Sequence, residues 1–95
     1  MRGNKIDSNQ GEIVAALRKI GCSVTSLADV GKGCPDLLVG LAGKNFLIEV
    51  KDGQKPPSAQ KLTSDQEIWH KVWQGQVKVI TNVNDALDLV TIEKV

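Results

Sequence analysis

The sequence predicts one α/β domain over residues 1–95, in which helices flank a mixed β-sheet in the order α-β-β-β-α-β-α. Three observations predict this class. Apolar residues recur at helical spacing in separate segments of the chain. Short runs of aliphatic and β-branched residues lie between these segments. The resulting order fits neither a TIM barrel nor a regular doubly wound sheet. A chain of 95 residues has room for one hydrophobic core.

The first helix is predicted over residues 9–20, where Ile13 and Leu17 share one apolar face. The glycine directly after this segment is expected to end the helix. Asn9 and Glu12 have the spacing of a capping box, in which each side chain bonds the backbone of the other residue. We therefore expect Asn9 to cap this helix.

Three strands are predicted next, over residues 22–27, 36–41 and 45–51. Residues 28–35 contain two glycines and are expected to form a loop. The second and third strands are separated by a short segment that contains Gly43, which is typical of a hairpin. The strands over residues 36–41 and 45–51 are therefore expected to pair with each other as a hairpin.

The second half of the chain is predicted to hold a loop over residues 52–61, a helix over 63–73, a strand over 77–81 and a helix over 84–93. Glycine and proline in the first segment predict the loop. A capping box is expected at the start of the first of these helices, from Thr63 or Ser64 with Gln66 or Glu67.

Composition excludes several classes of protein. Twelve Lys and Arg against eleven Asp and Glu give a formal net charge of +1, which excludes a strongly basic histone-like protein and an acidic tail protein. A balanced total can still hide a basic face that binds nucleic acid. Cys22 and Cys34 form no CxxC motif, so we expect reduced thiols and neither a zinc site nor a disulfide scaffold.

No membrane segment is expected, because the longest unbroken apolar run is residues 13–17 and a membrane span needs roughly 20. The first residues have no apolar stretch behind them, so we expect no secretory signal. We therefore expect a cytoplasmic protein, in the host cytoplasm if the source is viral.

Pro35-Asp36 followed by Glu49-Val50-Lys51 is the most informative pattern. Alternate residues of a strand share a face, so Glu49 and Lys51 project together with Val50 behind them. Pairing of the hairpin would bring Asp36 beside them. Two carboxylates can share a hard divalent cation, which polarises a phosphate and lowers the pKa of a bound water. A lysine can orient that water or offset charge on the phosphate.

Each half of this pattern also has an ordinary structural explanation. A Glu-x-Lys pair on a strand is common on a solvated sheet face, where it forms a weak ion pair. An aspartate after proline is a routine turn. The two halves together, at hairpin spacing and between apolar strands, favour a functional site.

Residues 33–40, 46–51 and 62–66 together resemble the PD-(D/E)xK nuclease superfamily, and more narrowly the VRR-NUC (virus-type replication-repair nuclease) family. The similarity extends over about residues 9–81. It implies a restriction-endonuclease-like fold and a metal-dependent deoxyribonuclease. The residues that it implies are Asp36 and Glu49 as ligands of Mg²⁺ or Mn²⁺, the Val50 carbonyl as a further ligand, Lys51 as the catalytic lysine, Glu12 as an acidic residue near the metal, and Gln66 as the family glutamine.

Several of these residues keep a second interpretation. Glu12 lies one turn before Ala16 on the stripe expected to face the sheet, where it could reach the metal as a ligand through water, or it could serve only the start of its helix. Gln66 could guide Lys51 and the scissile phosphate, or it could serve only a capping box. His70 is expected to be structural, although a histidine can act as a general base. Trp69 and Trp73 are expected to form core or dimer contacts. The loop lysines are either solvated or contact DNA phosphates: Lys32, Lys44, Lys55 and Lys61.

The resemblance implies an endonuclease that is specific for branched DNA such as four-way (Holliday) junctions, works in DNA repair and forms a homodimer. So compact a chain would suit a phage. No small-molecule cofactor and no membrane partner are expected. The alternative from another class is a non-catalytic DNA-binding or assembly module that retains the nuclease fold. A restriction-type or RNA-directed nuclease is a third option.

Overall fold

A computed structural model describes residues 7–92 of the protein. The order of helices and strands is the predicted α-β-β-β-α-β-α, with one short 3₁₀ helix added in the loop over residues 52–61. The predicted end of the last helix, at Glu93, lies outside the described residues. The elements are α1 (Gln10–Lys19), β1 (Ser23–Ser26), β2 (Leu37–Leu41), β3 (Lys44–Val50), η1 (Pro57–Gln60), α2 (Ser64–Val72), β4 (Lys78–Ile80) and α3 (Val83–Ile92).

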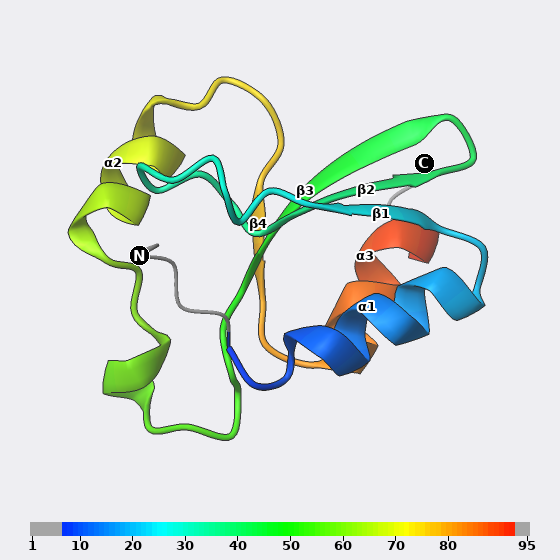
Figure 1. Ribbon diagram of the computed structural model, residues 1–95, viewed down its shortest axis with the longest axis horizontal. Helices are drawn as coiled ribbons and strands as arrows, with labels where there is room; N and C mark the ends of the chain where they lie inside the picture. The colour runs from blue at the N-terminus through cyan, green and yellow to red at the C-terminus, as the bar shows by residue number, and fades with distance from the viewer. Residues whose placement is uncertain (1–6, 93–95) are drawn as a thin grey trace.

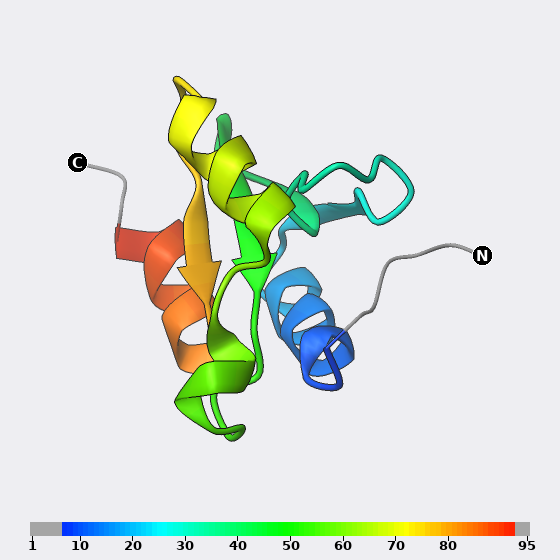
Figure 2. The ribbon, with the colours of Figure 1, turned by 90° about the vertical axis from the view of Figure 1, so that its left-hand side faces the viewer.

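The four strands form one mixed sheet in the order β1-β2-β3-β4. β2 pairs antiparallel with both β1 and β3, and β4 pairs parallel with β3. Helices α1 and α3 lie side by side against the sheet, whereas α2 lies away from both (Figures 1 and 2). The predicted mixed α/β sheet with flanking helices is therefore confirmed.

The hydrophobic core lies between the sheet and the α1–α3 pair. On β3, the alternating side chains Phe46, Ile48 and Val50 are all buried in this core. Helix α1 contributes Ile13 and Leu17, which are fully buried as the helical pattern predicted. The residues between them on β3 therefore project from the opposite face of the sheet.

The β2–β3 hairpin turns at Ala42 and Gly43, whose φ angles are both positive (53° and 80°). Positive φ at both central residues is the feature of the two-residue turns that match the twist of a hairpin. The register places Leu41 opposite Lys44 at the turn and Leu37 opposite Ile48 at the open end. This register decides which residues meet at the open end, where Pro35 and its neighbours lead into β2.

The capping box expected from Asn9 and Glu12 is wrong. Asn9 precedes α1 but makes no side-chain cap. Its side-chain Nδ2 instead donates to the carbonyl oxygens of Lys51 (3.2 Å) and Thr81 (3.1 Å). Both carbonyls follow the last residue of a strand. The Thr81 carbonyl also accepts the Gly53 N–H (3.0 Å), and the Asn9 amide adds a side-chain donor to each carbonyl. Asn9 thus ties the start of α1 to the ends of β3 and β4.

The capping box expected at α2 is present and joins Thr63 to Gln66. The loop before β2 packs against this first turn. Gly33 has a φ of +83°, and a Cβ built there would overlap the Asp65 carbonyl oxygen and come within 2.9 Å of the Gln66 nitrogen. Only glycine allows the loop and the helix backbone to approach this closely.

Gly33→Ala is therefore expected to lower the free energy of unfolding by roughly 2–4 kcal/mol, because it combines an unfavourable φ with a backbone clash. Gly31 is the matched control, since its φ is +75° but its Cβ position is open. Gly31→Ala should cost only about 1 kcal/mol. Chemical denaturation of both variants checks this, and equal costs would show that the close approach to α2 contributes nothing.

No helix within residues 7–92 has the length and apolar character required to cross a membrane.

Candidate active site

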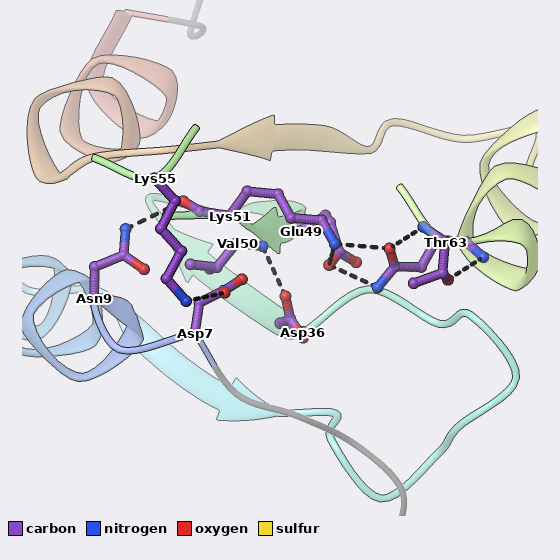
Figure 3. Close-up of polar contacts among 9 residues, drawn as sticks. Asp7, Asn9, Asp36, Glu49, Val50, Lys51, Lys55 and Thr63 are labelled. Atoms are coloured by element: carbon purple, nitrogen blue, oxygen red, sulfur yellow. Dashed lines mark hydrogen bonds and ion pairs between the residues drawn. The ribbon is translucent and has the colours of Figure 1, made fainter. Parts of the chain in front are cut away.

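The open end of the β2–β3 hairpin brings Asp36 next to Val50. The amide of Lys51 donates to the Ile80 carbonyl on the β4 side (3.0 Å), so the amide of Val50 faces the β2 side. Strand β2 begins only at Leu37, so the Asp36 carboxylate, and not a backbone carbonyl of β2, accepts this amide. Its Oδ2 accepts the Val50 N–H at 2.7 Å (Figure 3). The Val50 carbonyl faces the same edge of the strand.

Glu49 and Lys51 project from the face of β3 opposite the core, as the alternation predicted. Both are buried, with 1% and 8% of their surface exposed. The Lys51 Nζ lies 3.8 Å from Glu49 Oε2. Charged side chains are rarely buried without partners, so the surroundings of this pair decide what it can do.

Gln66 joins the two charged residues. Its Nε2 donates to Glu49 Oε2 (3.1 Å), and its Oε1 accepts from Lys51 Nζ (2.9 Å). The same Oε1 also accepts the backbone N–H of Thr63 (2.9 Å) in the capping box (Figure 3). Of the two roles left open by the sequence, capping α2 and guiding Lys51, Gln66 makes the contacts of both.

The two carboxyl groups resist simultaneous ionisation. Burial and the neighbouring Asp36 carboxylate together raise the pKa of Glu49 to about 9, and Lys51 only partly opposes these two effects. Burial also raises the pKa of Asp36, against the effect of the Val50 N–H. Ionisation of both carboxyls near neutral pH therefore needs an additional positive charge close to them.

The donor set fits a divalent cation. Glu49 Oε1 is buried and has no hydrogen-bond partner among the described residues. Two carboxylates and the Val50 carbonyl supply oxygen ligands of the kind that Mg²⁺ and Mn²⁺ accept. Within residues 7–92, no three His, Cys, Asp or Glu side chains are grouped so that they could hold a metal by themselves. The remaining positions would thus be left to the carbonyl and to water, as is usual for Mg²⁺.

A third carboxylate near the site comes from Asp7, which the sequence analysis did not single out. Asp7 lines the same cleft as Asp36 and Lys51, and its charge raises the pKa of both Asp36 and Glu49. Its Oδ1 lies 4.0 Å from the Nζ of Lys55 (Figure 3). Asp7 precedes α1, outside any periodic segment, so no sequence pattern marked it.

Glu12 does not lie on the sheet-facing stripe of α1, where it was expected. It is exposed, because the neighbouring Ile13 takes the buried position and successive helix residues point about 100° apart. Glu12 lines a separate hollow with Asn9 and Asp52. Its assignment as a metal ligand remains a prediction, and Asp7 is the acidic residue that this end of α1 brings to the cleft.

The cleft has a volume of about 630 Å³ and lies between the loop before β2, the loop after β3 and the start of α2. Asp36, Lys51 and Gln66 line it. The predicted DNA-binding lysines divide into two groups. Lys32, Lys55 and Lys61 line the cleft, whereas Lys44 lies at the hairpin turn, at the opposite end of β3.

His70 lies one helical turn beyond Gln66 but does not line this cleft. Its Nε2 is buried without a partner among the described residues, and burial together with the Lys51 charge lowers its pKa. Trp69 and Trp73 stack with ring centroids 4.6 Å apart. Trp73 also donates from Nε1 to the Gln76 carbonyl (3.2 Å). These contacts belong to the body of α2 and not to the carboxylate pair.

The raised pKa of Glu49 predicts a pH-dependent stability. Above about pH 4.5 the unfolded chain loses a proton that the folded, metal-free protein keeps, so folding stability falls as the pH rises toward 9. Glu49→Gln removes this titration. In the presence of a chelator, the variant should be more stable than wild type by roughly 2–4 kcal/mol at pH 8 and about equal near pH 4.5. Urea denaturation across this range measures the difference. A difference that does not vary with pH would mean that Glu49 titrates normally.

The comparisons with known proteins agree with this geometry. Neither a scan against protein-family models nor a search of curated proteins gave a match. A search of solved structures found a structure described as a VRR_NUC domain, with 25% sequence identity and a TM-score of 0.62. The match covers 86% of this chain and 94% of the other. The fold expected from the resemblance is thereby confirmed: the chain is a nuclease-like domain with a VRR-NUC-like fold.

Proposed function

We propose that this protein is a metal-dependent endonuclease that hydrolyses phosphodiester bonds in DNA. The observation that carries the proposal is the pair formed by half-buried Asp36 and buried Glu49 beside Lys51, at a cleft that Asp36, Lys51 and three further lysines line. Burying two carboxylates side by side is unfavourable for folding unless they bind something positive. A cation at that position would adjoin a cleft suited to phosphates.

Asp36, Glu49 and the Val50 carbonyl would hold Mg²⁺ or Mn²⁺. The bound ion supplies Lewis-acid polarisation of the phosphate and a water of lowered pKa. The contribution of the chain is the placement of its ligands. The Val50 N–H holds one oxygen of Asp36 and Gln66 holds one oxygen of Glu49, so each carboxylate is oriented.

Lys51 would act on the phosphate or on the attacking water. An ammonium group has three N–H donors, and Gln66 accepts one of them. Glu49 lies 3.8 Å away, so donor capacity remains for an oxygen in the cleft. A buried ammonium placed there before the reaction can offset negative charge that develops on the phosphate.

Lys32, Lys55 and Lys61 would contact phosphates on either side of the scissile bond. All three are exposed and come from loops around the cleft. Phosphate contacts of this kind position DNA without reading its sequence. Lys55 is paired with Asp7 at 4.0 Å, so DNA would compete with Asp7 for this ammonium.

The first prediction from this proposal concerns the carboxylates. Asp36→Ala and Glu49→Ala should each lower cleavage by more than about 100-fold, because oriented metal ligands are lost, while the fold is retained or gains stability. Lys51→Ala should lower the cleavage rate and leave Mg²⁺ affinity nearly unchanged. Cleavage is measured on linear, flap, splayed and four-way DNA with Mg²⁺ or Mn²⁺, and metal affinity by calorimetry.

The matched control is Asp88→Ala, which removes an exposed carboxylate of α3 that lines a different hollow. It should cleave like the wild type. Wild-type cleavage by the Asp36 or Glu49 variants would refute the assignment. DNA binding without cleavage by the wild type on any substrate would support a non-catalytic binding module instead.

We propose further that the protein is a homodimer acting on branched DNA. None of the nine residues of α2, all in the described part of the chain, is buried. Ile68, Val72 and Trp73 expose 62%, 64% and 44% of their surface, and Leu38 on the adjoining strand exposes 39%. Apolar side chains gathered on one face often mark a protein contact. A two-fold dimer would supply two cleavage sites for opposed strands of a junction.

This proposal predicts a dimer mass at micromolar concentration by light scattering. Val72→Glu should shift the protein to monomer, because an isolated charge cannot be buried in an apolar contact. Wild type should nick two opposed strands of a four-way junction and cut linear duplex poorly, and the variant should lose the paired cuts. A monomeric wild type that cuts one strand would refute the dimer and leave the nuclease chemistry intact.

A further inference from the structure

The capping box that starts α2 and the candidate active site share one side chain. Gln66 Oε1 accepts from the Thr63 backbone N–H and from Lys51 Nζ, both at 2.9 Å. The Thr63 hydroxyl in turn accepts the Gln66 backbone N–H at 3.2 Å. Gln66 Nε2 then reaches Glu49 Oε2 at 3.1 Å. Thr63 is thus connected to both charged residues through a single amide group.

The Thr63 N–H is one of three groups, with Lys51 and Glu49, that set which end of that amide faces Lys51. Oε1 receives two donors, so the reverse orientation would place the Gln66 NH₂ group against both the Thr63 N–H and the Lys51 ammonium. It would also leave Glu49 Oε2 facing an acceptor. The N–H at position 63 therefore favours the one orientation in which Gln66 accepts from Lys51 and donates to Glu49.

Few other contacts fix the first turn of α2 relative to β3. The far end of the helix is tied to β3 through Trp73, which donates to the Gln76 carbonyl, and through the Gln76 side chain, which pairs with the Leu47 backbone. No residue of this helix is buried, and Ile68 and Val72 are largely exposed. The close approach of Gly33 to the Asp65–Gln66 peptide is the other tight contact at this end of the helix. Because packing constrains α2 weakly, loss of a hydrogen bond in its first turn should change the position of the Gln66 side chain.

We propose that Thr63 is a positioning residue of the active site, which acts through Gln66 on Lys51 and Glu49. The inference rests on the proposed nuclease function. On this proposal, Lys51 and Glu49 are correctly oriented only when the first turn of α2 has formed. Thr63 also lines the cleft, so direct contact with DNA is the competing explanation of any effect on activity.

Three substitutions separate the contributions of the two hydrogen bonds of Thr63. Thr63→Ser keeps both the hydroxyl and the backbone N–H. Thr63→Val removes the hydroxyl alone. Thr63→Pro removes the N–H as well, and the φ of −71° at this position already suits proline. Thr63→Val keeps the test available should the proline variant fold poorly.

The proposal predicts a graded loss of kcat with little change in KM. Thr63→Val should lower kcat by about 3-fold and Thr63→Pro by about 10-fold or more, as expected for residues that orient catalytic groups. Thr63→Ser should restore the wild-type value. In a Gln66→Ala background, Thr63→Val and Thr63→Pro should have no further effect on kcat, although they still lower the unfolding midpoint.

The matched control is Glu67→Gly, which weakens α2 through helix propensity while its exposed side chain makes none of the hydrogen bonds to Lys51 or Glu49. It should lower the unfolding midpoint and leave kcat unchanged. An equal loss of kcat in Glu67→Gly and Thr63→Val would mean that Thr63 acts only as a helix cap. A raised KM that persists in the Gln66→Ala background would assign Thr63 to DNA contact.

A readout without DNA separates this inference from the proposed function. The side-chain NH₂ resonances of Gln66 in ¹⁵N-labelled protein should be protected from exchange in wild type and Thr63→Ser, and lose protection in Thr63→Pro. Unchanged protection would overturn the positioning role even in an active nuclease. Loss of protection in a protein that cleaves no DNA would leave the positioning role standing and refute the nuclease.

Discussion

The constraint on which the rest of the site depends is one buried carboxyl group, Glu49, and one half-buried carboxyl group, Asp36, beside the buried ammonium group of Lys51. Burial raises the pKa of both Asp36 and Glu49, and the Asp36 carboxylate adds to the rise at Glu49, whereas the interaction with Glu49 lowers the pKa of Asp36. Lys51 is close enough to Glu49 to compensate in part. Buried charges are tolerated only when hydrogen bonds and partners satisfy them, and the surrounding elements supply these bonds.

Each neighbouring element contributes at least one hydrogen bond around the site. The last amide of β3 binds Asp36, because β2 begins at Leu37, two residues after the position that the register would place opposite Val50. The first turn of α2 supplies Gln66 to both Glu49 and Lys51. The residue before α1, Asn9, binds the Lys51 carbonyl and so anchors the end of β3. The hairpin register thus fixes the charged residues, and the helix termini fix their orientation.

The hairpin and its charged residues could be predicted from the sequence, because both depend on local rules. Alternation along a strand places Glu49 and Lys51 on one face, and hairpin spacing brings Asp36 to them. The Thr63–Gln66 capping box is likewise a four-residue pattern. These features require knowledge only of neighbours in the chain or of one hairpin partner.

What the sequence did not reveal depends on packing between distant segments. Asp7 comes to the cleft only because α1 crosses near the end of β3, and no periodicity marks a residue before a helix. Asn9 had the pattern of a cap but binds carbonyls 42 and 72 residues away. Glu12 was placed on the wrong face, since the buried stripe of α1 is narrower than expected. The short helix η1 follows from proline geometry within a loop.

The central claim is that the carboxylate pair is arranged to bind a divalent cation. Thermal unfolding at pH 8 as a function of Mg²⁺ concentration, for wild type and Asp36→Asn, tests it most directly. Wild type should gain about 2.7 kcal/mol of stability when Mg²⁺ reaches 100 times its dissociation constant, and the variant should gain almost none. Equal stabilisation of both proteins, or none of the wild type, would contradict the claim.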